Sequence, residues 1–310
     1  TVTSSGRFTM AQTAITDLPG FANALHLDCT TADTSIAADE NLIIQYKFEG
    51  QDLQRLQKGT SSAKPVTVSF YAKANAAFTF VVELYDLDNT RNITQKFTTS
   101  TSWTRHTLTF PGDTSGVFDD DNAASLNLSF WLHSGTTFGG TGGTFVDNTW
   151  GTPTNANRTS GISSFFSSTD NDLKITGVQM ELGEQATPFE HRSFGDELER
   201  CKRYFQQIGS GYGKASSTSA FDCSVTFNPP MRANPTVSDN GTVVQITNIT
   251  SADHNQSSVG CADTDTGVTD GTYGGGRVRF SNFSSLTSGT TYAIDHNASQ
   301  GGAATFDAEL

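Results

Sequence analysis

The chain has 310 residues, more than one core usually serves, so its length predicts two domains or one large β-rich domain. Charged residues make up 16% of the chain, against about 25% in an average protein. The 45 Thr and 32 Ser together make up about a quarter of its residues. This composition is typical of β-sheet surfaces and argues against a mostly helical fold. The net charge of −13 disfavours nucleic-acid binding, which depends on clustered Lys and Arg.

The N-terminal stretch has the alternation of a strand and none of the marks of a signal peptide. It begins at Thr1, and Val2, Phe8 and Met10 fall in an alternating pattern. No run in the chain approaches the roughly 18 apolar residues that span a bilayer, so we expect no membrane insertion. The start inside a strand-like pattern leads us to expect that a preceding part is missing.

Alternating apolar residues predict six strands after residue 41, at 43–48, 66–73, 78–85, 103–110, 126–133 and 173–182. Along each strand one face is apolar; in 66–73 it carries Val66, Val68, Phe70 and Ala72. In 173–182 we expect a bulge at Gly177 that puts Val178, Met180 and Leu182 on one face. Antiparallel strands with one apolar face bury it against a second sheet, which predicts a jelly-roll β-sandwich.

A long segment rich in Gly, Thr, Ser and Asn lies between residues 134 and 169. Structureless loops of that length are usually functional or disordered. This one also contains aromatic residues, so we expect parts of it to be held against the sandwich; they are Phe138, Phe145, Trp150, Phe165 and Phe166.

One convincing helix is predicted, at 193–208. Ser193 can cap it, and Leu198, Cys201, Phe205 and Ile208 follow a helical period. The break at 209–211 then suggests a boundary. We therefore predict an all-β chain with a jelly-roll domain at 1–192, a short connecting helix at 193–208 and a smaller, sandwich-like β-domain at 209–310, whose strands are expected at 221–227, 236–238, 243–249, 277–280 and 291–295.

The four cysteines, Cys29, Cys201, Cys223 and Cys261, lie far apart and lack the short paired spacings of a cysteine zinc site. We expect free, partly buried thiols, because a chain of this size does not need covalent cross-links. At least one disulfide stays open as the alternative.

Several segments resemble bacteriophage tail-fibre and related virion proteins that carry a carbohydrate-binding-like jelly-roll. The motifs are Leu-Lys-Ile-Thr-Gly-Val-Gln-Met-Glu-Leu-Gly-Glu-Gln-Ala-Thr-Pro-Phe-Glu at 173–190 and Glu-Leu-Glu-Arg-Cys-Lys-Arg-Tyr-Phe at 197–205. Less specific likenesses occur at 45–56 together with 66–73, at 225–237 and in the final Phe-Asp-Ala-Glu-Leu. The resemblance implies a fibre, commonly a trimer, that is attached to the virion through an N-terminal part and carries a C-terminal domain outward.

If the inward faces are as assigned, the opposite faces present aromatic, amide and charged side chains, the mixture that a glycan cleft needs. The candidate glycan-binding residues are Tyr71, Lys73, Glu83, Tyr85, Trp131, His133 and Gln179. The alternative is that these side chains pack against the helix, a neighbouring domain or another copy of the chain, with Trp131 as an interface anchor.

Three acidic turns offer oxygen ligands for calcium, at 86–89, at Asp119, Asp120 and Asp121, and at 263–267. None has the Glu at position 12 that completes an EF-hand loop, so solvated turns are the simpler interpretation. We expect no cofactor and keep a structural calcium as an alternative.

No nucleophile elbow, HExxH motif or phosphate loop occurs, so we expect no enzyme. The leading hypothesis is a non-enzymatic phage tail-fibre protein of the virion that displays a host-recognition surface for cell-surface polysaccharide. The Gly-rich loops at 134–161 and 267–276 are the expected contact regions. The alternatives are a purely structural fibre or capsid decoration protein, a secreted carbohydrate-binding module of a glycan-degrading enzyme, and a depolymerase.

Overall fold

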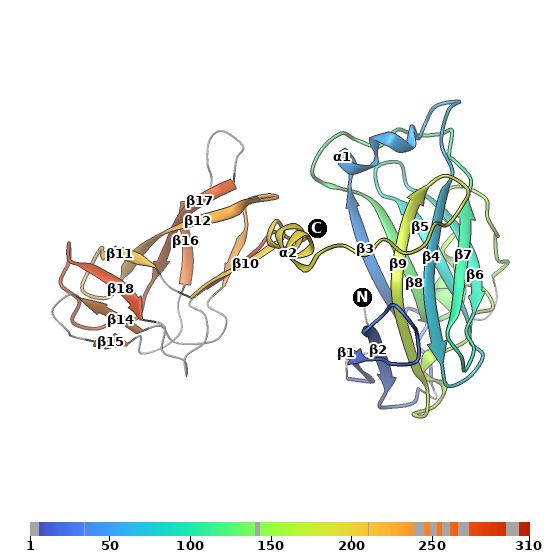
Figure 1. The fold of residues 1–310 in the computed structure, drawn as a ribbon, viewed down its shortest axis with the longest axis horizontal. Helices are drawn as coiled ribbons and strands as arrows, with labels where there is room; N and C mark the ends of the chain where they lie inside the picture. Colours follow the sequence, from blue (N-terminus) through green and yellow to red (C-terminus); the bar gives the residue numbers. More distant parts are fainter. Residues whose placement is uncertain are drawn as a thin grey trace. The chain divides into compact units, whose positions relative to one another are not determined.

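The computed structural model describes residues 6–33, 35–139, 143–209, 211–238, 245–248, 253–255, 261–265, 273–295 and 304–310. The chain divides into two compact units, Thr1–Glu190 together with Leu310, and His191–Glu309 (Figure 1). The first unit ends two residues before the expected position, and the second unit includes residues 193–208, which were expected to form a separate connection. Each unit is described by itself below.

The described residues of the first unit form nine strands in two antiparallel sheets (Figure 1). The five-stranded sheet has the order β1-β2-β9-β4-β7, and the four-stranded sheet has the order β3-β8-β5-β6. The strands are β1 Phe8–Ala14, β2 Asn23–Cys29, β3 Asn41–Glu49, β4 Val66–Ala74, β5 Thr79–Asp86, β6 Arg91–Thr98, β7 Thr104–Phe110, β8 Ala124–Ser134 and β9 Asp172–Leu182. Short helical turns join them, at α1 Gly50–Leu53, η1 Gln54–Leu56, η2 Thr136–Phe138, η3 Asn155–Asn157 and η4 Phe165–Ser167.

The strand order is that of a jelly roll. From β2 to β9 the chain forms β2-β9-β4-β7 in one sheet and β3-β8-β5-β6 in the other, the paired Greek keys of that architecture. The predicted fold class is confirmed, and all six predicted strands are present within two residues of their expected ends. The strands β2 and β6 were not predicted.

Alternation along the strands fills the space between the two sheets. The predicted inward residues Val68, Phe70 and Ala72 of β4 are fully buried, as is Phe80 of β5. Aromatic rings meet across the sandwich, since the Phe70 ring centroid lies 4.9 Å from those of Phe97 and Phe130, edge to face. Burial of these large apolar side chains is the main favourable term in folding this unit.

The bulge predicted at Gly177 is present in β9. Ser69 of β4 pairs with Gln179 and Tyr71 pairs with Thr176, so one residue of β4 faces two residues of β9. Gly177 has φ +60°, and a Cβ there would lie 2.8 Å from the Phe21 ring. Beyond the bulge Met180 packs against the core, while Val178 and Leu182, on the same face, are 41% and 47% exposed.

In the second unit, the part of the chain that the structure describes forms one helix and ten strands in two antiparallel sheets. A seven-stranded sheet has the order β15-β14-β18-β11-β12-β17-β16, and a three-stranded sheet has the order β10-β19-β13. Phe221 and Phe280 of the larger sheet share a core with Phe306 of the smaller one, so the unit is sandwich-like as expected. The elements are α2 Phe194–Lys202, β10 Phe205–Ile208, β11 Tyr212–Ala215, β12 Phe221–Met231, β13 Thr236–Ser238, β14 Gln245–Asn248, β15 Asp253–Asn255, β16 Cys261–Asp265, β17 Tyr273–Phe280, β18 Thr291–Asp295 and β19 Ala304–Asp307.

The predicted helix is present but shorter than expected. Ser193 caps it, since its hydroxyl accepts a hydrogen bond from the Asp196 amide. The helix ends at Lys202, and the expected extension to residue 208 is wrong because Phe205–Ile208 forms β10 and pairs with β19. The strand predicted at 243–249 corresponds to β14, Gln245–Asn248. Its remaining residues, 243, 244 and 249, lie outside the described ranges.

Cys29, Cys201 and Cys223 are free thiols, and Cys261 has a side chain outside the described set. The expectation of free thiols is met for these three. Within the described ranges, no helix is long and apolar enough to cross a membrane.

Candidate functional site

The outer face of the four-stranded sheet carries four of the candidate glycan-binding residues. Glu83 and Tyr85 lie on β5, and Trp131 and His133 lie on β8. Glu83 and His133 are fully buried and Trp131 is only 1% exposed. These three side chains present no surface to a sugar ring. The side chains that pack on them, Arg158 and Ser164 among them, come from the same unit and not from the helix, a neighbouring domain or another copy.

The 134–169 segment covers this face, and Arg158 anchors it. The Arg158 guanidinium donates to both Glu83 carboxylate oxygens, from Nε at 2.8 Å and from Nη2 at 2.6 Å. It also lies over the rings of Trp131, Tyr85 and Phe138, at 4.8, 5.1 and 5.9 Å. The hollow that remains beside Arg158 has a volume of about 60 Å³, well below the ~300 Å³ at which ligand pockets begin.

The buried Glu83 carboxylate is fully satisfied. Besides Arg158 it accepts hydrogen bonds from Trp131 Nε1 at 2.9 Å and from Asn92 Nδ2 at 2.8 Å. A buried charge is tolerated when it is both paired and hydrogen-bonded. The arrangement holds the segment in place, and Phe165 and Phe166, which are fully buried, secure it further as the sequence indicated.

Tyr71 and Gln179 lie on the other sheet, on β4 and β9. The segment 183–190, which follows β9, packs over their outer face (Figure 1). Gln179 donates to the Thr187 hydroxyl at 3.3 Å and accepts from the Glu190 amide at 2.8 Å, and the Tyr71 ring packs on Phe21 at 5.2 Å. Lys73, the next outward residue of β4, pairs with Asp17 at 2.5 Å.

The candidate residues therefore occupy the outward faces of two different sheets and do not converge on one cleft. Gln179 holds the segment 183–190 and Tyr71 packs on Phe21, whereas Glu83, Trp131 and His133 contact residues of the 134–169 segment. Tyr85 is half-buried beneath Arg158.

The acidic turn at Asp119, Asp120 and Asp121 is exposed. Its Asp121 carboxylate accepts from the Ala123 amide, and the Asp119 amide donates to the Asp88 carboxylate. These contacts are those of an ordinary polar turn. Calcium binding there stays a prediction, and the 263–267 turn has no described side chains.

A groove of about 640 Å³ lies in the second unit. It lies on the face of the seven-stranded sheet opposite the core, across β18, β11, β12 and β17. Strand register brings its lining together, because Lys214 pairs with Asp222 and with Thr291, and Ser224 pairs with Arg277. The residues that line it are Tyr212, Gly213, Lys214, Ala215, Ser216, Asp222, Ser224, Arg277, Ser288, Gly289 and Thr291.

The groove combines an aromatic ring with basic and hydroxyl groups. Tyr212 is 76% exposed, so the face of its ring is accessible. Arg279 holds Asp222 in a bidentate pair, at 2.7 and 2.9 Å, and this hydrogen bonding lowers the pKa of the Asp222 carboxyl. Lys214 and Arg277 are the basic residues that line the groove.

None of these groove residues was singled out from the sequence. The signal was present, because polar residues flank a buried one in Asp222-Cys223-Ser224 and in Arg277-Val278-Arg279. That alternation gives the outward face of each strand. It does not give the strand order that puts β11, β12 and β17 side by side.

No family model matches the chain, and no curated protein matches it. Among solved structures it is similar to a CBM4 structure, with 12% identity over 57% of this chain and 81% of the other, at a TM-score of 0.29. It is also similar to the family 11 carbohydrate-binding module of the Clostridium thermocellum cellulase Lic26A-Cel5E, with 13% identity over 60% and 88%, at 0.28. A third match, with 12% identity and a TM-score of 0.28, is the enzymatically active domain of bacteriophage CBA120 tailspike protein 4, of which it covers 19%. At these TM-scores the comparisons carry no argument about function, which is therefore argued from the residues of this chain.

Proposed function

We propose that the chain is a non-enzymatic fibre protein of a phage virion that binds a cell-surface polysaccharide through the groove of its second unit. The observation that supports binding is the groove itself, an open hollow of about 640 Å³ with an exposed tyrosine and several hydrogen-bonding groups. The phage assignment is supported by the motifs at 173–190 and 197–205.

The groove chemistry suits an acidic sugar. The Tyr212 ring offers a flat apolar platform for a pyranose, as aromatic rings do in sugar sites. Lys214 can donate to a carboxylate or sulfate, and Ser224 and Thr291 can exchange hydrogen bonds with hydroxyls. A polysaccharide rich in uronic acids or sulfate esters is the ligand class that follows.

We further propose that copies of this chain associate, as a fibre requires. The helix α2 buries none of its residues within the chain, and Phe194 and Leu198 on it are 83% and 40% exposed. Large apolar side chains exposed on one short helix are common where helices of several copies meet. Light scattering of the purified chain is expected to give three times the mass of one chain, and a monomer at high concentration contradicts this assembly.

The binding proposal is tested by competition of the purified chain with phage adsorption to candidate hosts, followed by binding to their isolated polysaccharides. Tyr212→Ala is expected to abolish both effects. Tyr46→Ala is the matched control, because Tyr46 is an exposed tyrosine, 58% accessible, on β3 of the first unit. Equal binding by both variants rejects the groove as the site.

Two alternatives predict other outcomes of the same experiment. A structural fibre or decoration protein gives no protection at saturating protein and no polysaccharide binding. A carbohydrate-binding module of a secreted enzyme binds polysaccharide without competing with any phage. Release of new reducing ends from the bound polysaccharide would instead indicate a depolymerase.

A further inference from the structure

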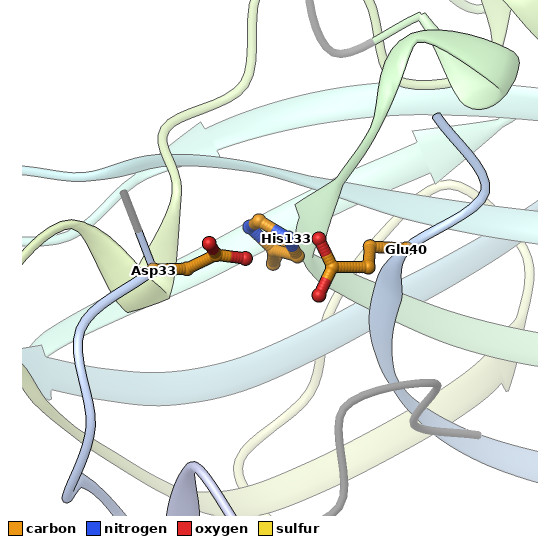
Figure 2. Close-up of side chains that lie close together, drawn as sticks. All are labelled: Asp33, Glu40 and His133. Atoms are coloured by element: carbon orange, nitrogen blue, oxygen red, sulfur yellow. The ribbon is translucent and has the colours of Figure 1, made fainter. Parts of the chain in front are cut away.

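Three side chains with metal-binding atoms meet at one end of the jelly roll. Asp33 and Glu40 lie between β2 and β3, and His133 lies near the end of β8; all three are buried, at 8%, 7% and 0% exposure. One donor atom from each residue lies within 4.8 Å of the others. Figure 2 shows the imidazole of His133 between the carboxylates of Asp33 and Glu40.

The backbone around the cluster fixes these positions. The Asp33 amide donates to Phe166 O at 2.8 Å, and the Gly135 amide donates to Glu40 O at 2.8 Å. His133 Nδ1 is 2.8 Å from the Ser164 hydroxyl, which orients the ring so that Nε2 is the free ring nitrogen. A hydrogen bond to the remote nitrogen of a ligating histidine is the usual companion of a metal site.

Two of the donor atoms lack any hydrogen-bond partner. Asp33 Oδ2 and His133 Nε2 are buried and unpaired, and the Asp33 side chain as a whole is 2% exposed. Leaving a buried polar atom unpaired costs about 1–3 kcal/mol, and more for a charged group. Unpaired atoms on two residues of one compact cluster mark a place for a bound species.

The charges at the cluster favour a cation. Arg7 is the nearest basic residue, with Nη1 at 3.1 Å from Asp33 Oδ1 and Nη2 at 3.7 Å from Glu40 Oε1. It contacts the carboxylate oxygens and leaves Asp33 Oδ2 unpaired. One arginine also balances only one of two buried carboxylates.

We propose that Asp33, Glu40 and His133 bind one divalent transition-metal ion, with Zn²⁺ as the best match. The imidazole nitrogen indicates which class of metal ion binds, because Ca²⁺ and Mg²⁺ take oxygen ligands whereas Zn²⁺ readily binds His together with carboxylates. Ligands at 2.0–2.2 Å around a tetrahedral zinc lie about 3.4 Å apart, so the cluster closes around the ion by small side-chain movements. The ion joins the β2–β3 connection to β8 and is a structural one.

The test uses the full chain without a histidine tag, stripped with a chelator and titrated with Zn²⁺ in a calorimeter. We expect one ion per chain and a metal-dependent rise in melting temperature, since a ligand that binds only the folded state stabilises it. Asp33→Asn, which keeps the shape of the side chain, and His133→Gln are each expected to weaken binding by about 100-fold or more and to remove that rise. Asp120→Asn is the control, because it removes one carboxylate from an exposed turn and leaves the cluster intact.

Co²⁺ supplies a second readout that a merely structural role of these residues does not produce. A cobalt ion bound by His133 and two carboxylates is expected to give visible absorption bands that change in His133→Gln. Near-ultraviolet circular dichroism checks that each variant is folded. If His133→Gln does not fold, Asp33→Asn alone tests the proposal. Absence of Zn²⁺ and Co²⁺ binding by the wild-type chain, or wild-type binding by folded Asp33→Asn, overturns the proposal and leaves an ion-pair cluster closed by Arg7.

Discussion

Arg158 Nη2 lies 2.6 Å from Glu83 Oε2, and the Glu83 side chain is completely buried. The pair joins two parts of the chain that are 75 residues apart. It joins the region around Arg158 to the outer face of the four-stranded sheet.

Arg158→Ala is expected to lower the free energy of unfolding by about 3–5 kcal/mol, because it leaves the Glu83 carboxylate buried without its counter-ion. Urea denaturation measures the change. Arg192→Ala is the matched control, since Arg192 pairs with Glu197 at the surface and exposed pairs contribute about 0–1 kcal/mol. Glu83→Gln in the Arg158→Ala background should restore part of the loss, and equal effects of the two arginine variants contradict the assigned role.

Phe70→Ala is expected to cost about 3–5 kcal/mol, because the ring is fully buried between Phe97 and Phe130 and its loss leaves a cavity. Phe194→Ala serves as the comparison, since that ring is 83% exposed within the chain. At low protein concentration, where copies are separate, its effect should stay within about 0.5 kcal/mol. A large, concentration-dependent effect of Phe194→Ala is instead the signature of association through α2.

The jelly roll is expected to lose stability in acid partly through His106. Burial lowers the pKa of the His106 imidazole below its ordinary value of 6.5. As pH falls, the unfolded chain therefore protonates His106 before the folded chain does. The contribution of neutral His106 to stability is complete above pH 6.5 and declines as pH falls toward the pKa of the folded state. Urea denaturation between pH 7.5 and 5 should show a smaller loss of unfolding free energy for His106→Gln than for the wild type. If the free energies of both proteins fall in parallel with pH, His106 is not the origin of the acid sensitivity.

Thiol reactivity should follow burial. Cys201 is exposed, whereas Cys29 and Cys223 are buried, and burial raises the pKa of the Cys223 thiol to about 11. In a Cys261→Ser background, an aromatic disulfide reagent is expected to label one thiol in the native chain and three after denaturation. Cys201→Ser should abolish the native signal; rapid native labelling of Cys223 contradicts the packing of the second core.

The period-2 patterns of β4, β5 and β8 were sufficient to predict the strands and the side that faces the core. They could not show that the other side is also covered. Trp131 and Glu83 alternate with core residues and therefore looked solvent-facing, but Arg158 and its segment close over them from far along the chain. Contacts at such separation leave no local pattern.

The helix shows the same limit at smaller scale. Phe205 and Ile208 fit the helical period that begins at Leu198, and nothing local distinguishes them. Their strand conformation comes from pairing with residues 304–307, about a hundred positions later. The Asp33–Glu40–His133 cluster was likewise invisible, because it depends on β8 passing next to the β2–β3 connection.

The extra residue at Gly177 also determines the path by which the chain leaves its first sandwich. Without it, Gln179 and Glu181 would point into the core and Met180 would point away, since a one-residue slip reverses every side chain in a strand. Gln179 and Glu181 are the residues that hold Thr187 and Glu190 on the outer face of the sheet. One extra residue in β9 thus determines which side chains are available to hold segment 183–190 against the sheet, and deletion of Gly177 is expected to release that segment from the outer face.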